Sequence, residues 1–219
     1  MSKASESRNK ICEAAIAVAA RDGFSSMSLD AVAAEAGVSK GGLLYHFGTK
    51  EELMHGTLQH FAEVGQHMLL GRIASDPNSE MRWARGIVSC MFPSDAELET
   101  TKQELDPSII FKFMLSMLTL AADRSTSIGP LTEMGTELRD RLLEDESVGL
   151  EQMLIWLAID GLLVWQLLGL IDPKDELFAR VGNEFRSRVG LSPREDSKEQ
   201  STKSKKTTQR TKRRKEGLK

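Results

Sequence analysis

The sequence predicts an all-α protein, built from an N-terminal three-helix helix-turn-helix domain and a larger helical C-terminal domain. Apolar residues recur at helical spacing through most of the first 191 of the 219 residues, and no segment shows the alternation of a convincing strand. Residues 28–61 read as a helix, a tight turn, a second short helix and the capped start of a third. We expect nine or ten helices, divided between residues 1–50 and 51–191, and a disordered tail over 192–219.

The first helix is expected from about Ser7 to Arg21, and the second follows Ser28. Serine is a strong N-cap residue because its hydroxyl accepts a hydrogen bond from a free backbone N–H of the first turn. Residues 31–36 are mostly small and helix-favouring, which lets two helices cross closely. Gly37 then supplies a sharp turn, since glycine adopts positive φ without strain.

The third helix is expected to be short and to start at Ser39, another N-cap candidate. Leu43 and Phe47 are four residues apart, so both are predicted to face the interior. The second helix of a helix-turn-helix enters the major groove of DNA, so the residues on its outer face are candidates for DNA contact. That outer face comprises Lys40, Gly41, Gly42, Tyr45 and His46.

A fourth helix is expected from Thr49 to about Gly71 and would link the two domains. Thr49 and Glu52 form a capping box, in which each side chain bonds a free backbone N–H at the start of the helix. Cap and breaker residues predict the remaining helices over 79–91, a short stretch after Ser94, 106–123, 130–145, 147–169 and 172–189.

The N-terminal part resembles the tetracycline-repressor (TetR) family of transcriptional regulators. The resemblance covers about a quarter of the chain and implies a regulator that binds a palindromic DNA operator as a homodimer and leaves it when a small molecule binds the C-terminal domain. Members often carry a residue able to touch a base where this chain has Gly42. The motifs that carry the resemblance are Ala36-Gly37-Val38-Ser39-Lys40-Gly41, Tyr45-His46-Phe47 and Lys50-Glu51-Glu52-Leu53.

We call the helix-turn-helix of residues 28–50 the reader. Within it, Ser39 and Lys40 are expected to face a phosphate of the DNA, and Lys50 is expected to face a flanking phosphate. Tyr45 and His46 offer a hydrogen bond to phosphate or a contact with a base edge. Glycines let the backbone approach the groove closely, and Arg8 with Lys10 would form an N-terminal arm. The candidate DNA-binding residues are Ser28, Ser39, Lys40, Gly41, Gly42, Tyr45, His46 and Lys50.

Charge is distributed unevenly along the chain, whose net charge is −3: residues 1–50 carry +1, residues 51–191 carry −11 and residues 192–219 carry +7. Basic ends around an acidic middle fit a protein that touches phosphates only with its extremities. The tail has one sizeable apolar residue, Leu218, and cannot bury a core. It either adds salt-dependent DNA affinity or only solubilises the chain, and both interpretations stay open.

Methionine and aromatic residues recur along the C-terminal helices. Met-rich surfaces adapt to varied ligands, although such stripes also form ordinary core. Two charges, Lys112 and Asp160, stand among apolar neighbours, and a buried charge needs a partner. Asp160 is therefore expected either to meet a ligand group or to pair with a basic side chain, and the pair is favoured. The candidate ligand-binding residues are Trp83, Phe111, Met114, Met117, Met153, Trp156 and Asp160.

The last two helices carry more apolar surface than the interior of one domain needs. In the TetR family the final helices form a four-helix dimer interface, so the resemblance implies a homodimer with its two reader helices on successive faces of the major groove. The apolar run 153–171 contains Asp160 and Gln166, and is interpreted as a buried helix rather than a membrane span. The apolar residues concerned are Leu163, Leu167, Leu168, Leu170, Phe178, Val181 and Phe185.

Other classes of protein receive little support from the sequence. Cys12 and Cys90 lie in helical patterns and are expected to be buried thiols in a reducing cytoplasm, and the first residues lack the apolar core of a signal peptide. We find neither a Gly-rich phosphate loop nor a nucleophile elbow, so we expect no enzyme and no cofactor.

Two alternatives within the regulator class stay open. The first is a regulator that responds to a metal or to a partner protein; His60, Glu63 and His67 share one side of a predicted helix and are the candidate metal ligands. Their spacing is a weak signal, and we predict no metal site. The second alternative is an activator or a broad DNA binder that relies on the basic tail.

Overall fold

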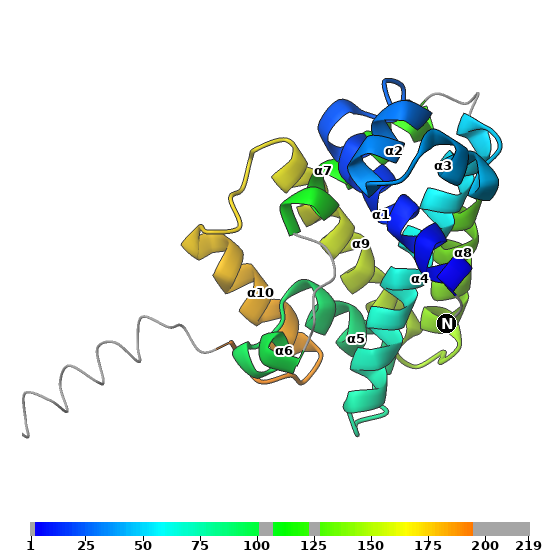
Figure 1. The fold of residues 1–219 in the computed structure, drawn as a ribbon. Coiled ribbons are helices and arrows are strands. Elements are labelled where there is room, and N and C mark those ends of the chain that lie inside the picture. The colour runs from blue at the N-terminus through cyan, green and yellow to red at the C-terminus, as the bar shows by residue number, and fades with distance from the viewer. Residues whose placement is uncertain (1–2, 101–106, 123–127, 195–219) are drawn as a thin grey trace, which may run out of the picture.

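The computed structural model describes residues 3–100, 107–122 and 128–194, and each regular element within these ranges is a helix (Figure 1). The ten helices of the described residues are α1 (Lys3–Asp22), α2 (Leu29–Ala36), α3 (Lys40–His46), α4 (Lys50–Ser75), α5 (Arg82–Met91), α6 (Asp95–Thr100), α7 (Pro107–Ala122), α8 (Gly129–Leu143), α9 (Gly149–Leu167) and α10 (Glu176–Arg188). The predicted all-α class is confirmed. The predicted tail lies outside the described residues from 195 onward.

A first hydrophobic core holds α1, α2 and α3 together with the start of α4 and one face of α7. Phe113 of α7 is fully buried, and its ring centroid lies 5.2 Å from that of Phe24 and 4.9 Å from that of Phe61. The backbone N–H of Phe24 donates to the hydroxyl of Ser116, also on α7, at 3.0 Å. The core of the N-terminal part therefore extends beyond residue 50, the domain boundary predicted from the sequence.

A second core lies between α5, α9 and α10, at the other end of the molecule from α2 and α3 (Figure 1). Phe92 is its centre: its ring stacks on Phe185 at 5.8 Å and lies 5.2 Å from Phe178. The apolar residues Phe178 and Phe185, predicted to form a dimer interface, are thus turned into the interior of their own chain. Both side chains are nevertheless only half-buried, so their place in a dimer interface stays a prediction.

A polar network closes this second core. Arg186 is buried and donates to the carbonyl of Phe92 at 2.7 Å and to the Glu97 carboxylate at 3.0 Å. Glu97 also accepts from the hydroxyl of Ser89 and from the backbone N–H of Ser94 at 2.5 Å. These bonds tie α6 to α10 and satisfy charged groups that would be costly to bury alone.

Most predicted helix starts agree with the structure, and those of α1, α5 and α10 do not; α1 begins at Lys3, four residues before the predicted start. The hydroxyls of Thr49 and Ser94 each accept from the backbone N–H three residues on. Glu97 completes its capping box by accepting from the N–H of Ser94, whereas Glu52 accepts from the N–H of Gly48, one residue before the predicted Thr49. Ser79 does not cap α5, which follows Met81 in a left-handed conformation, φ 49°. The last helix begins at Glu176 after Asp175, because the side chains of Asp172 and Asp175 stabilise a preceding turn through backbone N–H groups.

The predicted burial of α9 is wrong for the single chain. By length and composition this helix could cross a membrane, and most of it is not buried. Asp160 and Lys112 are exposed too, so neither is the buried charge that was predicted. The exposed apolar side chains follow one stripe, which we call the α9 face: Leu150, Leu154, Leu157, Val164, Trp165 and Leu168.

Candidate nucleic-acid interface

The turn between α2 and α3 has the local geometry that the sequence predicts. The Ser28 hydroxyl accepts from the backbone N–H of Ala31 at 3.2 Å, and the Ser39 hydroxyl accepts from that of Gly42 at 3.0 Å. Between the two helices Gly37 has φ 65°, the left-handed conformation that a side chain would strain. Each helix of the motif is therefore held by its own cap, and the turn between them requires glycine.

One side of α3 is anchored and the other is presented to solvent. Leu43 and Phe47 are buried in the first core, as predicted. Tyr45 is 82% exposed, and the half-buried His46 ring meets it edge-on with centroids 5.0 Å apart. An exposed tyrosine presents an apolar ring and a hydroxyl that can bond a partner. The α3 surface therefore offers a hydroxyl and an imidazole for hydrogen bonding.

The cations near α3 are held by the chain itself. The ammonium of Lys40 lies 3.0 Å from a carboxylate oxygen of Asp30 on α2. Lys50 donates to the carbonyl of Ser25 at 2.9 Å. Neither partner could be predicted from the sequence, because tertiary packing brings them together.

The predicted N-terminal arm is wrong, because its residues belong to α1. The guanidinium of Arg8 lies over the ring of Phe47, 4.9 Å from its centroid, where it supports the end of α3. Lys10 is exposed on the same helix. Arg8 thus packs on Phe47 at the end of α3 and does not form an arm that extends toward DNA.

Gly56 is a position that sequence reasoning overlooked. It brings α4 so close to α3 that an added Cβ would lie 2.4 Å from a ring carbon of Phe47. Its carbonyl oxygen also lies 3.5 Å from the sulfur of Cys12, which donates to it from α1. Burial raises the pKa of Cys12 to about 12, which keeps the thiol protonated and inert. A glycine inside a helix is its only local signal, and Gly65 of α4 shares that signal without any such neighbour.

The predicted ligand-binding residues are spread over three helices. Trp83 is half-buried on α5, and Met153 and Trp156 are half-buried on α9. On α7, Phe111 and Met114 are half-buried, and Met117 packs against the first core. Asp160 is exposed, and desolvation by its apolar surroundings raises the pKa of its carboxyl. Their role in ligand binding stays a prediction.

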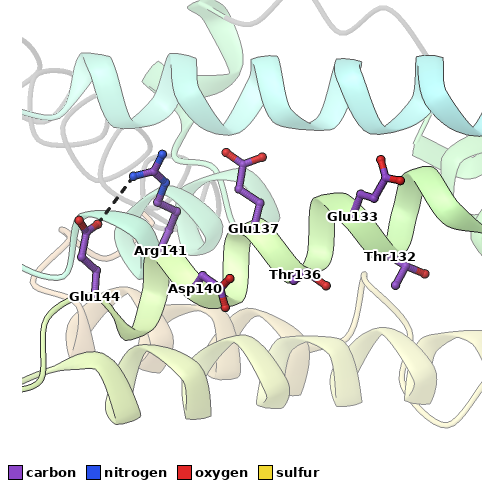
Figure 2. Close-up of a pocket in the computed structure, with 7 residues that line it drawn as sticks. All are labelled: Thr132, Glu133, Thr136, Glu137, Asp140, Arg141 and Glu144. Atoms are coloured by element: carbon purple, nitrogen blue, oxygen red, sulfur yellow. Dashed lines mark ion pairs between the residues drawn. The ribbon is translucent and has the colours of Figure 1, made fainter.

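A surface hollow of about 730 Å³ lies elsewhere, along α8. Figure 2 shows Glu133, Glu137 and Arg141 pointing from α8 toward the neighbouring helix α4. The guanidinium of Arg141 lies 3.9 Å from the carboxylate of Glu144. None of the predicted ligand-binding residues lines this hollow, whose lining is Thr132, Glu133, Thr136, Glu137, Asp140, Arg141 and Glu144.

The three residues considered as metal ligands are not in equivalent surroundings. His60 is buried, and its Nε2 lies 4.0 Å from Oε1 of Glu13 on α1. Glu63 and His67, by contrast, are exposed on α4. Within the described ranges no three His, Cys, Asp or Glu side chains gather in an arrangement that could hold a metal ion.

Comparison with known proteins gives two matches to family models. Residues 11–57 match the model of bacterial regulatory proteins of the tetR family, and residues 81–188 match that of the tetracyclin repressor-like C-terminal domain. The chain is also 32% identical over 89 residues to the HTH-type transcriptional regulator SrpR of Pseudomonas putida. That alignment covers 41% of this chain and 40% of the regulator.

Solved structures share the fold over most of the chain. A member of the TetR family from Streptomyces coelicolor A3 is 26% identical with a TM-score of 0.59, covering 82% of this chain and 98% of that one. A putative transcriptional regulator from Pseudomonas aeruginosa PAO1 has a TM-score of 0.61 at 19% identity, covering 86% and 92%. At the lower identity the likeness shows the fold alone.

Proposed function

Because the chain belongs to the TetR family of DNA-binding transcriptional regulators, we propose that it is a cytoplasmic homodimeric repressor that a small molecule releases from a palindromic operator. Regulators of this family are transcription factors rather than enzymes. The observation that carries the proposal is the arrangement of α3, whose inner side chains are buried while Tyr45 stands out into solvent.

The contacts of α3 with DNA follow from that arrangement. Tyr45 and His46 would enter the major groove, where they can hydrogen-bond a base edge or a phosphate. Gly41 and Gly42 leave room for the backbone to approach the groove. Lys40, Lys50, Ser39 and Ser28 would line the flanking phosphates, which supply most of the affinity and little of the sequence preference.

The α9 face supports the homodimer. Leu150 is 70% exposed, and the stripe continues along the whole helix to Leu168 just beyond its end. A contiguous apolar surface of this kind marks an association site. A second copy packed by two-fold symmetry would cover both α9 faces at once and would place two α3 helices for a palindrome.

The packing of α7 supports the coupling between effector and DNA. Phe113 and Ser116 contact Phe24, in the turn after α1, so a shift of α7 moves a residue of the first core. α4 joins the two domains directly and touches α3 at Gly56. An effector that favours one arrangement of these helices would change DNA affinity by its differential binding to the two states.

The test is selection of bound sequences from a random duplex pool by the purified protein, with a Lys40→Ala, Tyr45→Ala variant beside it. We expect wild type to enrich a palindrome and the variant to lose it. Enrichment that follows charge alone, equal for both proteins, would contradict the assigned reader and favour the broad DNA binder.

The dimer is tested separately by sedimentation. Leu157→Arg places a charge in the α9 face and is expected to yield monomers at micromolar concentration. Leu115→Arg is the matched control, since Leu115 is a similarly exposed leucine on α7 outside that face. If both variants sediment as wild type does, the α9 face is not the interface.

A further inference from the structure

Asp30 and Lys40 form an ion pair across the two helices of the reader. The ammonium nitrogen of Lys40 lies 3.0 Å from the carboxylate, and both side chains are more than half exposed. An exposed ion pair of this kind shifts an equilibrium by at most about fivefold. It can therefore form in free protein and open when a phosphate competes for the lysine.

The charge of the reader makes this pair consequential. Residues 25–50 contain two Lys or Arg residues, Lys40 and Lys50, and two acidic residues, Asp30 and Glu35. Lys50 is engaged by the carbonyl of Ser25 and Lys40 by Asp30. The helix-turn-helix itself thus presents no net positive charge to a DNA duplex, although non-specific binding depends on such charge.

From this geometry we propose that Asp30 is a specificity-determining residue, which holds Lys40 away from phosphate until α3 is seated in its operator. In a loose complex with DNA of arbitrary sequence the pair stays closed, and Lys40 displaces no counterion. In the seated complex base contacts bring a phosphate close enough to replace the carboxylate. Asp30 thereby lowers affinity for DNA of any sequence more than affinity for the operator.

The second acidic residue of α2 provides a matched control. Glu35 makes an ion pair of the same length, 3.0 Å, with Arg21 of α1. Its replacement by glutamine changes the net charge as Asp30→Asn does, but it leaves Lys40 in its pair, and Arg21 keeps its second ion pair, with Asp22 at 3.2 Å. The two isosteric variants therefore separate release of Lys40 from a general gain of positive charge.

The experiment measures binding to a 30-base-pair duplex of mixed sequence, by fluorescence anisotropy between 50 and 200 mM salt. Asp30→Asn is expected to steepen the logarithmic salt dependence by about 0.9 for each reader, one added phosphate contact. The DNA affinity of Asp30→Asn relative to that of wild type is then expected to fall about 3.5-fold per reader between 50 and 200 mM salt. Glu35→Gln and the double variant Asp30→Asn, Lys40→Ala are expected to keep the wild-type slope.

Equal slopes for Asp30→Asn and wild type would overturn the inference, and so would an equally steep slope for Glu35→Gln or for the double variant. The inference rests on the proposed placement of α3 against DNA, which is checked separately with the palindrome recovered by selection. Loss of palindrome binding in wild type would remove the proposed function. If wild type binds its palindrome and Asp30→Asn has the same salt dependence as wild type, only the role of Asp30 is refuted.

Discussion

Replacing Gly56 by alanine tests whether α3 is positioned by its contact with α4. The added methyl group would lie 2.4 Å from one ring carbon of Phe47 and 3.1 Å from a nitrogen of Arg8. Carbon atoms in ordinary contact are about 3.5–4.0 Å apart, so the ring has to move by roughly 1 Å. Phe47 is buried and Arg8 stacks on its ring, so the displacement reaches the end of the reader helix.

The magnitude follows from two opposing contributions to the free energy of unfolding. Alanine is favoured over glycine within a helix by about 0.8–1 kcal/mol. Overpacking a filled interior costs about 1–3 kcal/mol. Gly65→Ala on the same helix supplies the comparison, because an added Cβ there meets nothing within 4 Å. The two variants share the helix contribution, so Gly56→Ala is expected to be about 1–3 kcal/mol less stable than Gly65→Ala.

Urea denaturation of both variants measures this difference, and binding to the selected operator measures its consequence. Gly56→Ala is expected to bind the operator more weakly, since α3 shifts relative to α2. Gly65→Ala is expected to bind as wild type does. Equal stability and equal operator affinity for the two variants would refute the reasoning that this contact positions α3.

The remaining predictions concern pH. Asp160→Asn is expected to stabilise the protein at pH 7, because desolvation by apolar neighbours raises the pKa of the Asp160 carboxyl, and wild type therefore loses stability as pH rises above about 3.8. Urea denaturation at pH 3.5 and 7 checks this, and equal curves for the two proteins at pH 7 would contradict it. Burial raises the pKa of Glu97, but hydrogen bonds from Ser89 and Ser94 and the Arg186 charge outweigh it and bring the pKa to about 2. Glu97→Gln is therefore expected to lower the free energy of unfolding by on the order of 1 kcal/mol at neutral pH, after allowance for solvent screening. In urea denaturation this difference from wild type should disappear as pH falls from 4.5 toward 2. A difference that persists at pH 2 would contradict this account.

Much of the fold was predictable because its determinants are local. Ser28, Ser39 and Thr49 cap their helices through bonds that span three residues, and Gly37 adopts the positive φ expected of it. Helical spacing likewise placed Leu43 and Phe47 inside and Tyr45 outside. Such features depend on neighbours along the chain, which can be read directly from the sequence.

Predictions about tertiary neighbours succeeded less often. Phe178 and Phe185 have the spacing of an interface, yet they pack on Phe92 of their own chain. Asp160 was predicted to be buried and lies exposed beside the α9 face. An apolar helix face must be covered, but periodicity alone does not tell whether its own chain or another covers it.

The sequence by itself determined an all-α chain, a capped helix-turn-helix and the outward face of α3, because caps, turns and periodicity act within a few residues. Only the tertiary structure decided that Asp30 holds Lys40, that Arg8 supports Phe47, and that α4 approaches α3 at Gly56. Each of these contacts joins residues from different helices. Their existence depends on crossing angles and distances that emerge when all the helices pack at once, so no local pattern encodes them.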